Sequence, residues 1–567
     1  MAKIWKIKQS NERLQKEISR ALDISRVCAQ VLINRGVTSA EEARSFLDCD
    51  LANLHDPFLL RGMKKAVQRI KKAILEGKRI MVWGDYDIDG ITSVALLTSV
   101  LKEMGADVCH YLPNRLEEGY GLNEKGAREA AKTGVGLLIT VDCGISAHKQ
   151  IDYLKKMGID TIVCDHHQPK GDALPQRAWA IINPLQKGCP YPYKHLAGVG
   201  LAAKVACALT DNQKDILDKH LDIVALGTVG DVVPLTGENR ILVKCGLASI
   251  RQTKKLGLLA LMEASGLANR EINARHIGYI LGPRINASGR LGSPEDSLRL
   301  LLAETELEAQ NLAKKLNQGN RLRQRIESRT LQEAVEQVES RINFKEHNII
   351  VLGAPHWHRG VIGIVASRLV ERYLRPTIMM TLEDDFGRGS GRSIGNFHLL
   401  EALKRCKDLL EEYGGHRRAC GLKLKKARFA EFFQAINRVA KGMLLPEDLV
   451  PTLEIDVEMP LSNLDADLID GLEALSPFGA DNPQPVICSS GLKVRTKTSI
   501  VAGNHIKFWV TDGRLTCEVI GYNKAGAFPL LEAGQTVDLA YSPSINNWQG
   551  NFSIQLKLED LKISSDG

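Results

Sequence analysis

The sequence predicts an α/β protein that combines two α/β domains, a long helix between them and a small C-terminal β-barrel. The chain has 567 residues, which is too many for one hydrophobic core. From Arg79 to about Leu185, short apolar β-rich runs alternate with helical stretches, as in a parallel sheet covered by helices. From Pro451 onward, short β-like runs are separated by Gly, Asn and Pro, which is typical of a barrel or sandwich.

Changes of pattern along the chain predict five segments. A polar, helical N-terminal segment is expected to pack on the first, parallel-sheet domain. After that domain come a long helical pattern, a second and smaller α/β domain, and the β-barrel. The expected bounds are residues 1–75, 76–293, 294–343, 344–448 and 449–567.

Strands of the first α/β domain are expected at apolar runs without strict alternation, because strands buried on both faces have this pattern. The runs lie at residues 80–83, 107–112, 137–141, 161–164 and 180–182. Helical patterns separate or follow them, at residues 92–104, 147–157 and 199–265.

Composition excludes some classes of protein. The 75 Lys and Arg residues and 67 Asp and Glu residues give a formal net charge of +8, which permits a polyanionic partner without requiring one. The 12 cysteines include no CxxC pair, and their scatter argues against zinc, redox or disulfide frameworks. No run approaches the length of a membrane span and no signal peptide is recognisable, so a cytoplasmic protein is expected.

Acidic residues and histidines follow three of the expected strands. The first strand leads into Asp85, Asp87 and Asp89, a later strand into Asp142, and the next into residues 165–167, Asp-His-His. The carboxyl ends of parallel strands lie along one sheet edge, where ligands bind. The three clusters are therefore expected to meet in space.

Crowded aspartates repel one another and raise one another's pKa, so a compensating cation is expected. Carboxylates with imidazole and without thiolate suit Mn²⁺ or Mg²⁺, and two such ions could clamp a phosphoryl group. The alternative for Asp85 or Asp165 is a helix N-cap, and adjacent histidines are often surface or core residues. Because each of the three clusters follows the carboxyl end of an expected strand, a metal site is favoured for Asp87, Asp89, Asp142 and His166. His167 is a further candidate.

These motifs resemble those of a known superfamily, the DHH phosphoesterases. The matching segments are Asp-Tyr-Asp-Ile-Asp-Gly at residues 85–90, Val-Asp-Cys-Gly at residues 141–144 and Asp-His-His at residues 165–167. Further segments are similar to one branch, the bacterial RecJ exonucleases, so that the resemblance covers essentially the whole chain. They lie at residues 112–121, 197–200, 225–235, 282–291, 357–366, 389–393 and 414–421.

The resemblance implies a metal-binding set of Asp87, Asp89, Asp142, His166 and Asp231. Catalytic roles are expected for His167, Asp85 and Asp165. The ordinary pKa of an imidazole suits His167 to stabilising charge or donating a proton near neutrality. Spacing alone does not choose Asp231, because Asp222 on the same expected helix is an equal candidate. In family II pyrophosphatases a histidine precedes the first ligand by four residues. Trp83 stands there in this chain, which argues against a pyrophosphatase.

Glycine-rich segments with arginine in the second half predict a phosphate cradle, with Arg392 between Gly391 and Ser393 as the sharpest case. Taken singly, each arginine is more often a surface residue. The resemblance implies that Ser390 and Arg392 hold a 5′ end, and that Arg284 and His416 contact the phosphate near the scissile bond. The full expected set of phosphate and DNA contacts is Arg115, Arg284, Asn286, Arg290, Ser390, Arg392 and His416.

Two further regions could bind a polyanion. The basic residues between Lys314 and Arg329 are either a solvated or coiled-coil helix face or a phosphate-tracking connector. Aromatic residues at residues 506–510 and 545–552 are either barrel core or stacking surfaces for bases. The resemblance implies that the barrel is an OB-fold that grips DNA.

The activity implied by the resemblance is that of a single-stranded-DNA-specific 5′→3′ exonuclease, which releases 5′ mononucleotides with two divalent ions, Mn²⁺ or Mg²⁺, in recombination and repair. One alternative is an oligonucleotide or pAp phosphatase of the same superfamily, whose chains are shorter and lack the barrel. The other is a non-catalytic single-strand DNA-binding scaffold, which the apparently complete aspartate and histidine set disfavours. A monomer is expected, with single-stranded DNA, single-strand binding protein and a RecQ-type helicase as partners.

Overall fold

The structure is a computed structural model, and it describes residues 3–169, 173–210, 212–548 and 551–563. The chain forms two compact units. One consists of Met1–Leu54, Pro234–Lys244 and Pro451–Gly567 and contains the β-barrel. The other consists of His55–Val233 and Cys245–Val450 and contains both α/β domains.

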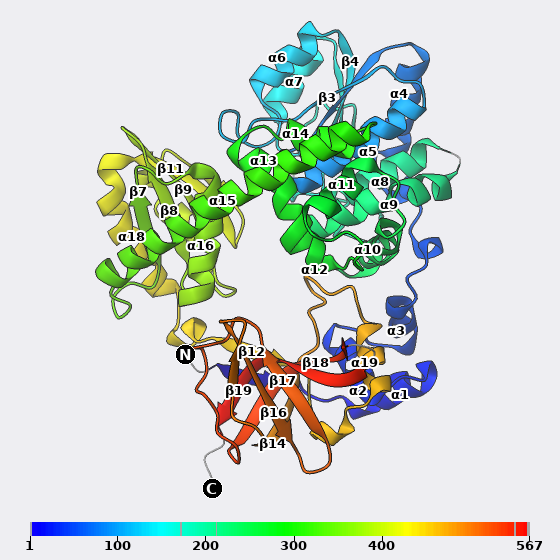
Figure 1. Ribbon diagram of the computed structural model, residues 1–567. Helices are drawn as coiled ribbons and strands as arrows, with labels where there is room; N and C mark the ends of the chain where they lie inside the picture. The colour runs from blue at the N-terminus through cyan, green and yellow to red at the C-terminus, as the bar shows by residue number, and fades with distance from the viewer. Residues whose placement is uncertain (1–2, 170–172, 211, 549–550, 564–567) are drawn as a thin grey trace. The chain divides into compact units, whose positions relative to one another are not determined.

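A five-stranded parallel sheet forms the first α/β domain, as predicted (Figure 1). Its strands, in the spatial order β3-β2-β4-β5-β6, are β2 Arg79–Trp83, β3 Val108–Tyr111, β4 Val135–Val141, β5 Asp160–Cys164 and β6 Ala180–Ile182. All but the first residue of β2 are buried, because helices cover both faces of the sheet.

Helices α6 and α7 pack on one face of this sheet, around Trp83, Leu138 and Leu154. On the other face, α5 packs against α8 and α9. These helices and α4 have the bounds α4 Met63–Leu75, α5 Ile88–Glu103, α6 Glu124–Lys132, α7 His148–Lys156, α8 Gly198–Leu209 and α9 Gln213–Gly230. The helices that follow are α10 Gly237–Ile250, α11 Leu256–Ala264, α12 Ala274–His276, the π-helical turn η3 Ile277–Leu281 and α13 Gly282–Leu291.

The expected helix over residues 294–343 is in fact two helices, α14 Glu295–Leu301 and α15 Glu306–Arg341. The break has a local cause, because the Thr305 side chain accepts a hydrogen bond from the Glu308 N–H and so caps the start of α15. Helix α15 has 36 residues and runs from the first α/β domain to the second (Figure 1).

The second α/β domain has a mixed sheet in the order β10-β11-β9-β8-β7, in which only β7 and β8 are parallel. Its elements are β7 Ile350–Ala354, α16 Arg359–Tyr373, β8 Thr377–Leu382, β9 Phe386–Arg392, α17 Leu399–Arg405, η4 Lys407–Leu409, β10 Glu412–Gly415, β11 Ala419–Lys425, η5 Lys426–Arg428 and α18 Phe429–Met443. Helix α16 packs between α15 and the sheet, with Val361 and Val365 fully buried.

The C-terminal region closes into a five-stranded barrel, as the β-like pattern predicts. Strand β14 pairs with β16 and β18, and β17 pairs with β16 and, in parallel, with β19. The pairing of β18 with β19 completes the ring. The elements are η6 Pro446–Leu449, β12 Thr452–Ile455, β13 Val457–Glu458, η7 Leu461–Asn463, α19 Ala466–Glu473, β14 Ile487–Val494, β15 Ser499–Val501, β16 His505–Thr511, β17 Thr516–Gly521, β18 Thr536–Trp548 and β19 Asn551–Ile563.

The N-terminal segment differs from expectation, because its described residues up to Leu54 pack on the barrel and not on the parallel-sheet domain. Strand β1 pairs with β12, and Ile18 and Leu32 share a core with the barrel residue Phe508. A buried ion pair of 2.8 Å joins Arg35 to Asp456. The segment contains β1 Ile4–Ile7, α1 Glu12–Leu22, α2 Arg26–Asn34, α3 Ala40–Leu47 and η1 Leu51–Asn53.

From the expected segment 1–75, η2 Pro57–Leu59 and α4 pack on α8 of the first α/β domain. The physical reason for the difference is that each apolar helix face packs where a surface is left uncovered. Local periodicity identifies such a face but not its partner. None of the helices in the described part of the chain is both long enough and apolar enough to cross a membrane.

Candidate active site

The first cluster, after β2, is held by the start of α5. Asp87 caps this helix, since its Oδ1 accepts hydrogen bonds from the N–H groups of Asp89 and Gly90 at 3.1 and 3.2 Å. Asp89 is fully buried, and its two oxygens accept hydrogen bonds from Gly198 and Val199 at the start of α8, at 2.6 and 2.7 Å. The carboxylates of Asp87 and Asp89 are therefore fixed by backbone groups.

Gly198 permits the close approach of α8 to the site. A Cβ atom at this position would lie 2.7 Å from the Asp142 Cβ and 2.9 Å from the Asp89 Oδ2. Asp142 itself adopts a φ of 59°, a left-handed conformation that aspartate tolerates better than most residues. The start of α5, the residue after β4 and the start of α8 therefore lie in direct contact.

The predicted convergence at the sheet edge is observed. The Nε2 atom of His166, which follows β5, lies 3.1 Å from the Asp142 Oδ1, 3.6 Å from the Asp231 Oδ2 and 3.9 Å from the Asp89 Oδ2. Ligand atoms of Asp89, His166 and Asp231 all lie within 4.8 Å of one another. The same holds for a second group, Asp85, Asp87 and Asp142.

Burial and mutual repulsion raise the pKa values of these carboxyl groups. Burial, with the charge of Asp87, raises the pKa of Asp89 to about 7. Burial and the neighbouring aspartates raise the pKa values of Asp142 and Asp231 well above the usual range. Burial also lowers the pKa of His166 to about 4, so the imidazole is neutral and available as a ligand at pH 7.

Several buried atoms of the cluster lack a hydrogen-bond partner among the described residues. They are the Asp85 Oδ1, the Asp142 Oδ1, the His166 Nε2 and the Asp231 Oδ2. Buried polar atoms are normally paired, and acceptor atoms that face one another need a cation between them. Carboxylate oxygens with a neutral imidazole are a donor set that fits divalent Mn²⁺ or Mg²⁺.

Asp231 and Asp222, which the sequence could not separate, have different surroundings. Asp231 follows α9 as its C-cap residue, and its carboxylate joins the cluster. The buried Asp222 lies within α9, where its carboxylate accepts hydrogen bonds from the Thr253 hydroxyl at 2.7 Å and from the Lys255 ammonium at 2.8 Å. Neither aspartate is the helix N-cap, which is Asn212.

The Asp165 carboxylate orients His167 and is not among the grouped ligand atoms. Its Oδ1 accepts hydrogen bonds from the Nδ1 atom and the N–H of His167, at 2.8 and 3.0 Å, and its Oδ2 accepts one from the Ile145 N–H at 2.8 Å. Burial opposes ionisation of both partners, but this contact lowers the pKa of Asp165 and raises that of His167. Asp165 caps none of the described helices.

Tyr120 is a site residue that sequence reasoning did not single out. Its hydroxyl lies 3.0 Å from the Asp142 carbonyl oxygen and 3.1 Å from the His167 Nδ1 atom. The residue belongs to the motif over residues 112–121, which was the available signal. Asp85, by contrast, was expected at the site and is buried there, where burial and Asp87 raise its pKa well above the usual range.

Three of the expected phosphate-binding arginines lie close enough to affect one another. Burial lowers the pKa of Arg290 to about 10, and the charges of Arg115 and Arg392 add to this effect. Arg290 on α13 donates a hydrogen bond to the Gly360 carbonyl at the start of α16, at 3.2 Å. Arg290 is therefore affected by cations from both α/β domains and also by the charge of Asp87.

Ser390 and Arg392 are two residues apart on β9 and so lie on the same face of the strand. The Arg392 Nη1 donates hydrogen bonds to the Ser390 hydroxyl at 3.0 Å and to the Gly391 carbonyl at 2.8 Å. Gly363 on α16 makes room for them, since a Cβ atom there would lie 2.8 Å from the Ser390 Oγ and 3.0 Å from the Arg392 Nη2. Burial lowers the pKa of Arg392, and so does the charge of Arg115.

The other three residues expected to contact phosphate or DNA are Asn286, Arg284 and His416, of which the first two hydrogen-bond within the protein and the third is exposed. Asn286 accepts a hydrogen bond from the Ile88 N–H at 2.8 Å, so its side chain oxygen supports the turn after Asp87. Arg284 donates hydrogen bonds to the Asn317 side chain at 3.1 Å and to the Ile280 carbonyl at 2.6 Å. His416 is exposed in the turn between β10 and β11.

The basic stretch of α15 is partly neutralised. Arg323 pairs with Glu327, Arg329 with Glu333 at 3.0 Å, and Lys315 with Asp296 at 2.8 Å. The exposed cations for which no ion pair is present among the described residues are Lys314, Arg321 and Arg325. The part of α15 that could bind phosphates through unpaired cations is therefore shorter than the sequence predicts.

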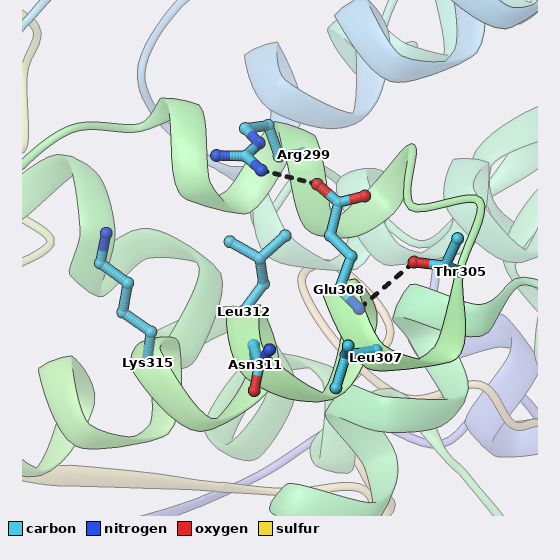
Figure 2. A pocket seen from close by; sticks show the side chains of 7 residues that line it. All are labelled: Arg299, Thr305, Leu307, Glu308, Asn311, Leu312 and Lys315. Carbon is cyan, nitrogen blue, oxygen red and sulfur yellow. Dashed lines mark hydrogen bonds and ion pairs between the residues drawn. The ribbon is translucent and has the colours of Figure 1, made fainter.

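A separate pocket lies between α14 and α15 and contains none of the acidic cluster (Figure 2). Figure 2 shows Arg299 directed toward Glu308, with an ion pair of 2.7 Å, and the cap contact between Thr305 and Glu308. Its other cation, Lys315, pairs with Asp296. The pocket is thus lined by neutralised charges and lacks the grouped carboxylates that catalysis by divalent ions requires.

Comparisons with known proteins agree with this geometry. The DHH family, N-terminal domain, matches residues 79–228, the DHHA1 domain matches residues 346–442, and the RecJ OB domain matches residues 455–560. The single-stranded-DNA-specific exonuclease RecJ of Bacillus subtilis is 37% identical over 563 residues, which cover 99% of this chain and 71% of that protein. RecJ of Escherichia coli is 34% identical, with 98% of this chain and 100% of that protein covered.

Solved structures give the same result. Crystal structures of RecJ from Thermus thermophilus match in complex with Mn²⁺, with a TM-score of 0.85 and 32% identity, and with Mg²⁺, with a TM-score of 0.79 and 30% identity. The two matches cover 99% of this chain and 80% and 79% of the respective solved chains. The similarity extends over both α/β domains and the barrel.

Proposed function

Because this chain belongs to the family of RecJ single-stranded-DNA-specific exonucleases, we propose that it degrades single-stranded DNA from the 5′ end and releases 5′ mononucleotides in DNA recombination and repair. The observation that carries the proposal is the set of unpartnered buried atoms of Asp142, His166 and Asp231, which face one another at the sheet edge. Such a set is costly unless cations occupy it, and it is suited to phosphodiester hydrolysis.

Asp87, Asp89, Asp142, His166 and Asp231 would hold two divalent ions, Mn²⁺ or Mg²⁺. Bound ions of this kind supply a nucleophilic hydroxide at neutral pH and stabilise the charge on the attacked phosphate. The backbone N–H groups at the starts of α5 and α8 orient the carboxylates of Asp87 and Asp89. The ligand set is therefore largely formed before any ion binds.

His167 is proposed to stabilise or protonate the leaving oxygen. Asp165 holds its Nδ1 atom, which leaves the Nε2 atom as the one that can face a substrate. The Tyr120 hydroxyl contacts the same imidazole and the Asp142 carbonyl, so it restrains the ring relative to the metal-binding residues. In this scheme Asp165 and Tyr120 act through His167.

The arginines are proposed to bind the phosphates of the strand. Arg115, Arg290 and Arg392 repel one another, and a bound phosphate would relieve that repulsion. The pair Ser390 and Arg392 supplies a hydroxyl and a guanidinium for a terminal 5′ phosphate, with Arg284 and His416 nearer the scissile bond. Base-stacking aromatic residues of the barrel are a further proposed contact, and Trp509 on β16 is half-buried. The side chain of Trp548 lies outside the described residues.

Digestion of single strands labelled at the 5′ or the 3′ end tests this activity, in Mn²⁺, in Mg²⁺ and with a chelator. We expect early release of 5′-labelled mononucleotide, progressive shortening of 3′-labelled strands and no cleavage with the chelator. Long strands should be degraded as readily as short ones. A preference for dinucleotides or pAp would support the phosphatase alternative, and binding without metal-dependent cleavage would support the scaffold.

Replacing Arg392 by Ala is expected to raise KM for a 5′-phosphorylated strand by about 10- to 100-fold, since a charge-assisted hydrogen bond contributes about 1.5–3 kcal/mol. The loss should be much smaller for a strand with a 5′ hydroxyl. Arg372→Ala is a matched control, because Arg372 is an exposed arginine of the same domain that pairs with Glu339 at 3.6 Å. Equal effects of Arg392→Ala on both strand types would contradict the proposed 5′ phosphate contact.

The proposals of single-strand binding protein and a RecQ-type helicase as partners, of a cytoplasmic location and of a monomer rest on the family resemblance. Light scattering of the purified chain measures its oligomeric state directly. Titration with purified single-strand binding protein, followed by fluorescence anisotropy, tests that partner. A dimer, or no binding at protein concentrations of tens of micromolar, would contradict these two expectations.

A further inference from the structure

The chain leaves the unit that contains both α/β domains two residues after Asp231. Asp231 has helical backbone angles, and its N–H donates a hydrogen bond to the Gly227 carbonyl at 2.9 Å. The unit ends at Val233, and Pro234 begins a segment that belongs to the barrel unit. Pro234 restricts Val233 to extended conformations, so the change of direction has to occur at Val232.

Val232 makes this turn in an unfavourable conformation. Its φ is +63°, a left-handed value that is a genuine outlier for a β-branched side chain. Among the described non-glycine residues with positive φ, it is the one that is β-branched. Glycine or asparagine would adopt this backbone with less strain.

Burial of the side chain does not account for the strain. The Val232 side chain is 73% exposed, so it contributes little to any core. The backbone hydrogen bond of Asp231 restrains the residue before the turn, and Pro234 restrains Val233 after it. Neither restraint requires a valine side chain at position 232. The chain therefore holds an apolar side chain in an exposed and strained position directly after Asp231.

We propose that Val232 is a substrate-contact residue, which presents its side chain to the apolar surface of a nucleotide next to the metal-binding cluster. The inference rests on the proposed function, because it takes Asp231 to be part of the hydrolytic site. Single-stranded DNA offers apolar surface on its bases and deoxyribose rings, whereas its phosphates are bound by cations. Residues with strained backbone angles cluster at ligand-binding sites, where the strain holds a side chain in the position that the ligand requires.

The test compares three substitutions at one position. Val232→Gly and Val232→Asn keep a left-handed turn accessible but remove the apolar side chain. Both should raise KM for a single-stranded oligothymidylate about five- to tenfold, which corresponds to the loss of one partly buried valine contact. Val232→Ile retains branching and apolar surface, and it should keep KM within about twofold of the original value.

Two further readouts separate substrate contact from a structural role. The melting temperature of Val232→Gly and Val232→Asn should be unchanged or higher, because strain is relieved, and Mn²⁺ binding measured by electron paramagnetic resonance should be unchanged. Ala502→Gly is the matched control, since Ala502 is an exposed residue with a φ of 48° in the barrel unit. It should alter melting temperature in the same direction and leave KM unchanged.

An oligothymidylate with abasic sites at its 5′ end distinguishes base from sugar. If Val232 contacts a base, the variants and the original chain should bind this strand equally, and if it contacts a sugar the difference should persist.

Unchanged KM in Val232→Gly would overturn the proposal. Weaker Mn²⁺ binding or a lower melting temperature would also overturn it, by assigning Val232 a structural role. Failure of the unaltered chain to cleave single strands would instead refute the proposed function.

Discussion

Replacement of Asp142 by Asn is expected to abolish hydrolysis and, at the same time, to stabilise the metal-free chain. The carboxylate lies 3.1 Å from His166 and is grouped with Asp85 and Asp87, so its loss should lower kcat by about 10³-fold or more, or at least about 4 kcal/mol. Asparagine tolerates the φ of 59° at this position, and it removes one of several mutually repelling charges. Rate measurements in Mn²⁺ and thermal unfolding in EDTA check the two effects.

Asp222→Asn is the matched control for this substitution. Asp222 is as buried as Asp142, at 2% and 3% exposure, but its carboxylate is paired with Lys255 and Thr253. Asn at position 222 should therefore lose about 1–3 kcal/mol of stability and retain activity. Retained hydrolysis in Asp142→Asn, or lower stability of that variant in EDTA, would contradict the assignment of Asp142 to a cation site. Binding of single-stranded DNA should survive, because the arginines are unchanged.

Removal of divalent ions is expected to stop hydrolysis and to expose a pH-dependent instability. The pKa of Asp89 is about 7 in the folded, metal-free chain, well above the ordinary value of 3.8. Between about pH 4 and pH 7 this carboxyl is protonated in the folded chain but ionised in the unfolded chain. Its contribution to stability is therefore fully present below about pH 4 and is lost as the pH rises to about 7. The Asp89 carboxyl should therefore contribute a loss of roughly 2–4 kcal/mol across that window, measured as the difference between the metal-free chain and metal-free Asp89→Asn. The lowered pKa of His166 acts in the opposite direction and is common to both chains.

Added Mn²⁺ should reverse this loss, and more strongly at higher pH. The ion binds ionised carboxylates, so binding at pH 6–7 should release protons, and the stabilisation should increase toward pH 8. Thermal unfolding at several pH values with and without Mn²⁺ measures the effect, and calorimetry in two buffers of different ionisation enthalpy measures the protons. Asp89→Asn should remove this contribution. Hydrolysis in EDTA, or the same dependence of stability on pH in the metal-free chain and in metal-free Asp89→Asn, would refute the prediction.

Local patterns were enough to locate the chemistry of this site. Strands buried on both faces have continuous apolar sequences, and in a parallel sheet their carboxyl ends share one edge. These two rules place Asp87, Asp142 and His166 together from the sequence, and the folded chain confirms that they meet. The same kind of pattern indicated a small C-terminal β domain, a barrel or a sandwich, and the strand pairing shows that it is a closed barrel.

The positions of other site residues depend on tertiary packing, which a local sequence pattern does not predict. Asp222 and Asp231 are nine residues apart on or next to α9, which turns them about 180° from each other. Only the packing of α9 against α5 and α8 decides which of them faces His166. The contacts of Tyr120 and the strained turn at Val232 likewise arise where separate segments meet.

The sequence by itself determined the alternation of strands and helices in the first α/β domain, the sheet edge that carries the metal-binding candidates and the presence of a small C-terminal β domain. Tertiary structure alone decided that the N-terminal segment belongs to the barrel, through the Arg35–Asp456 pair and the β1–β12 pairing. The physical reason is that periodicity reveals which face of an element is apolar. Which distant surface covers that face depends on the shape and charge of the whole folded chain.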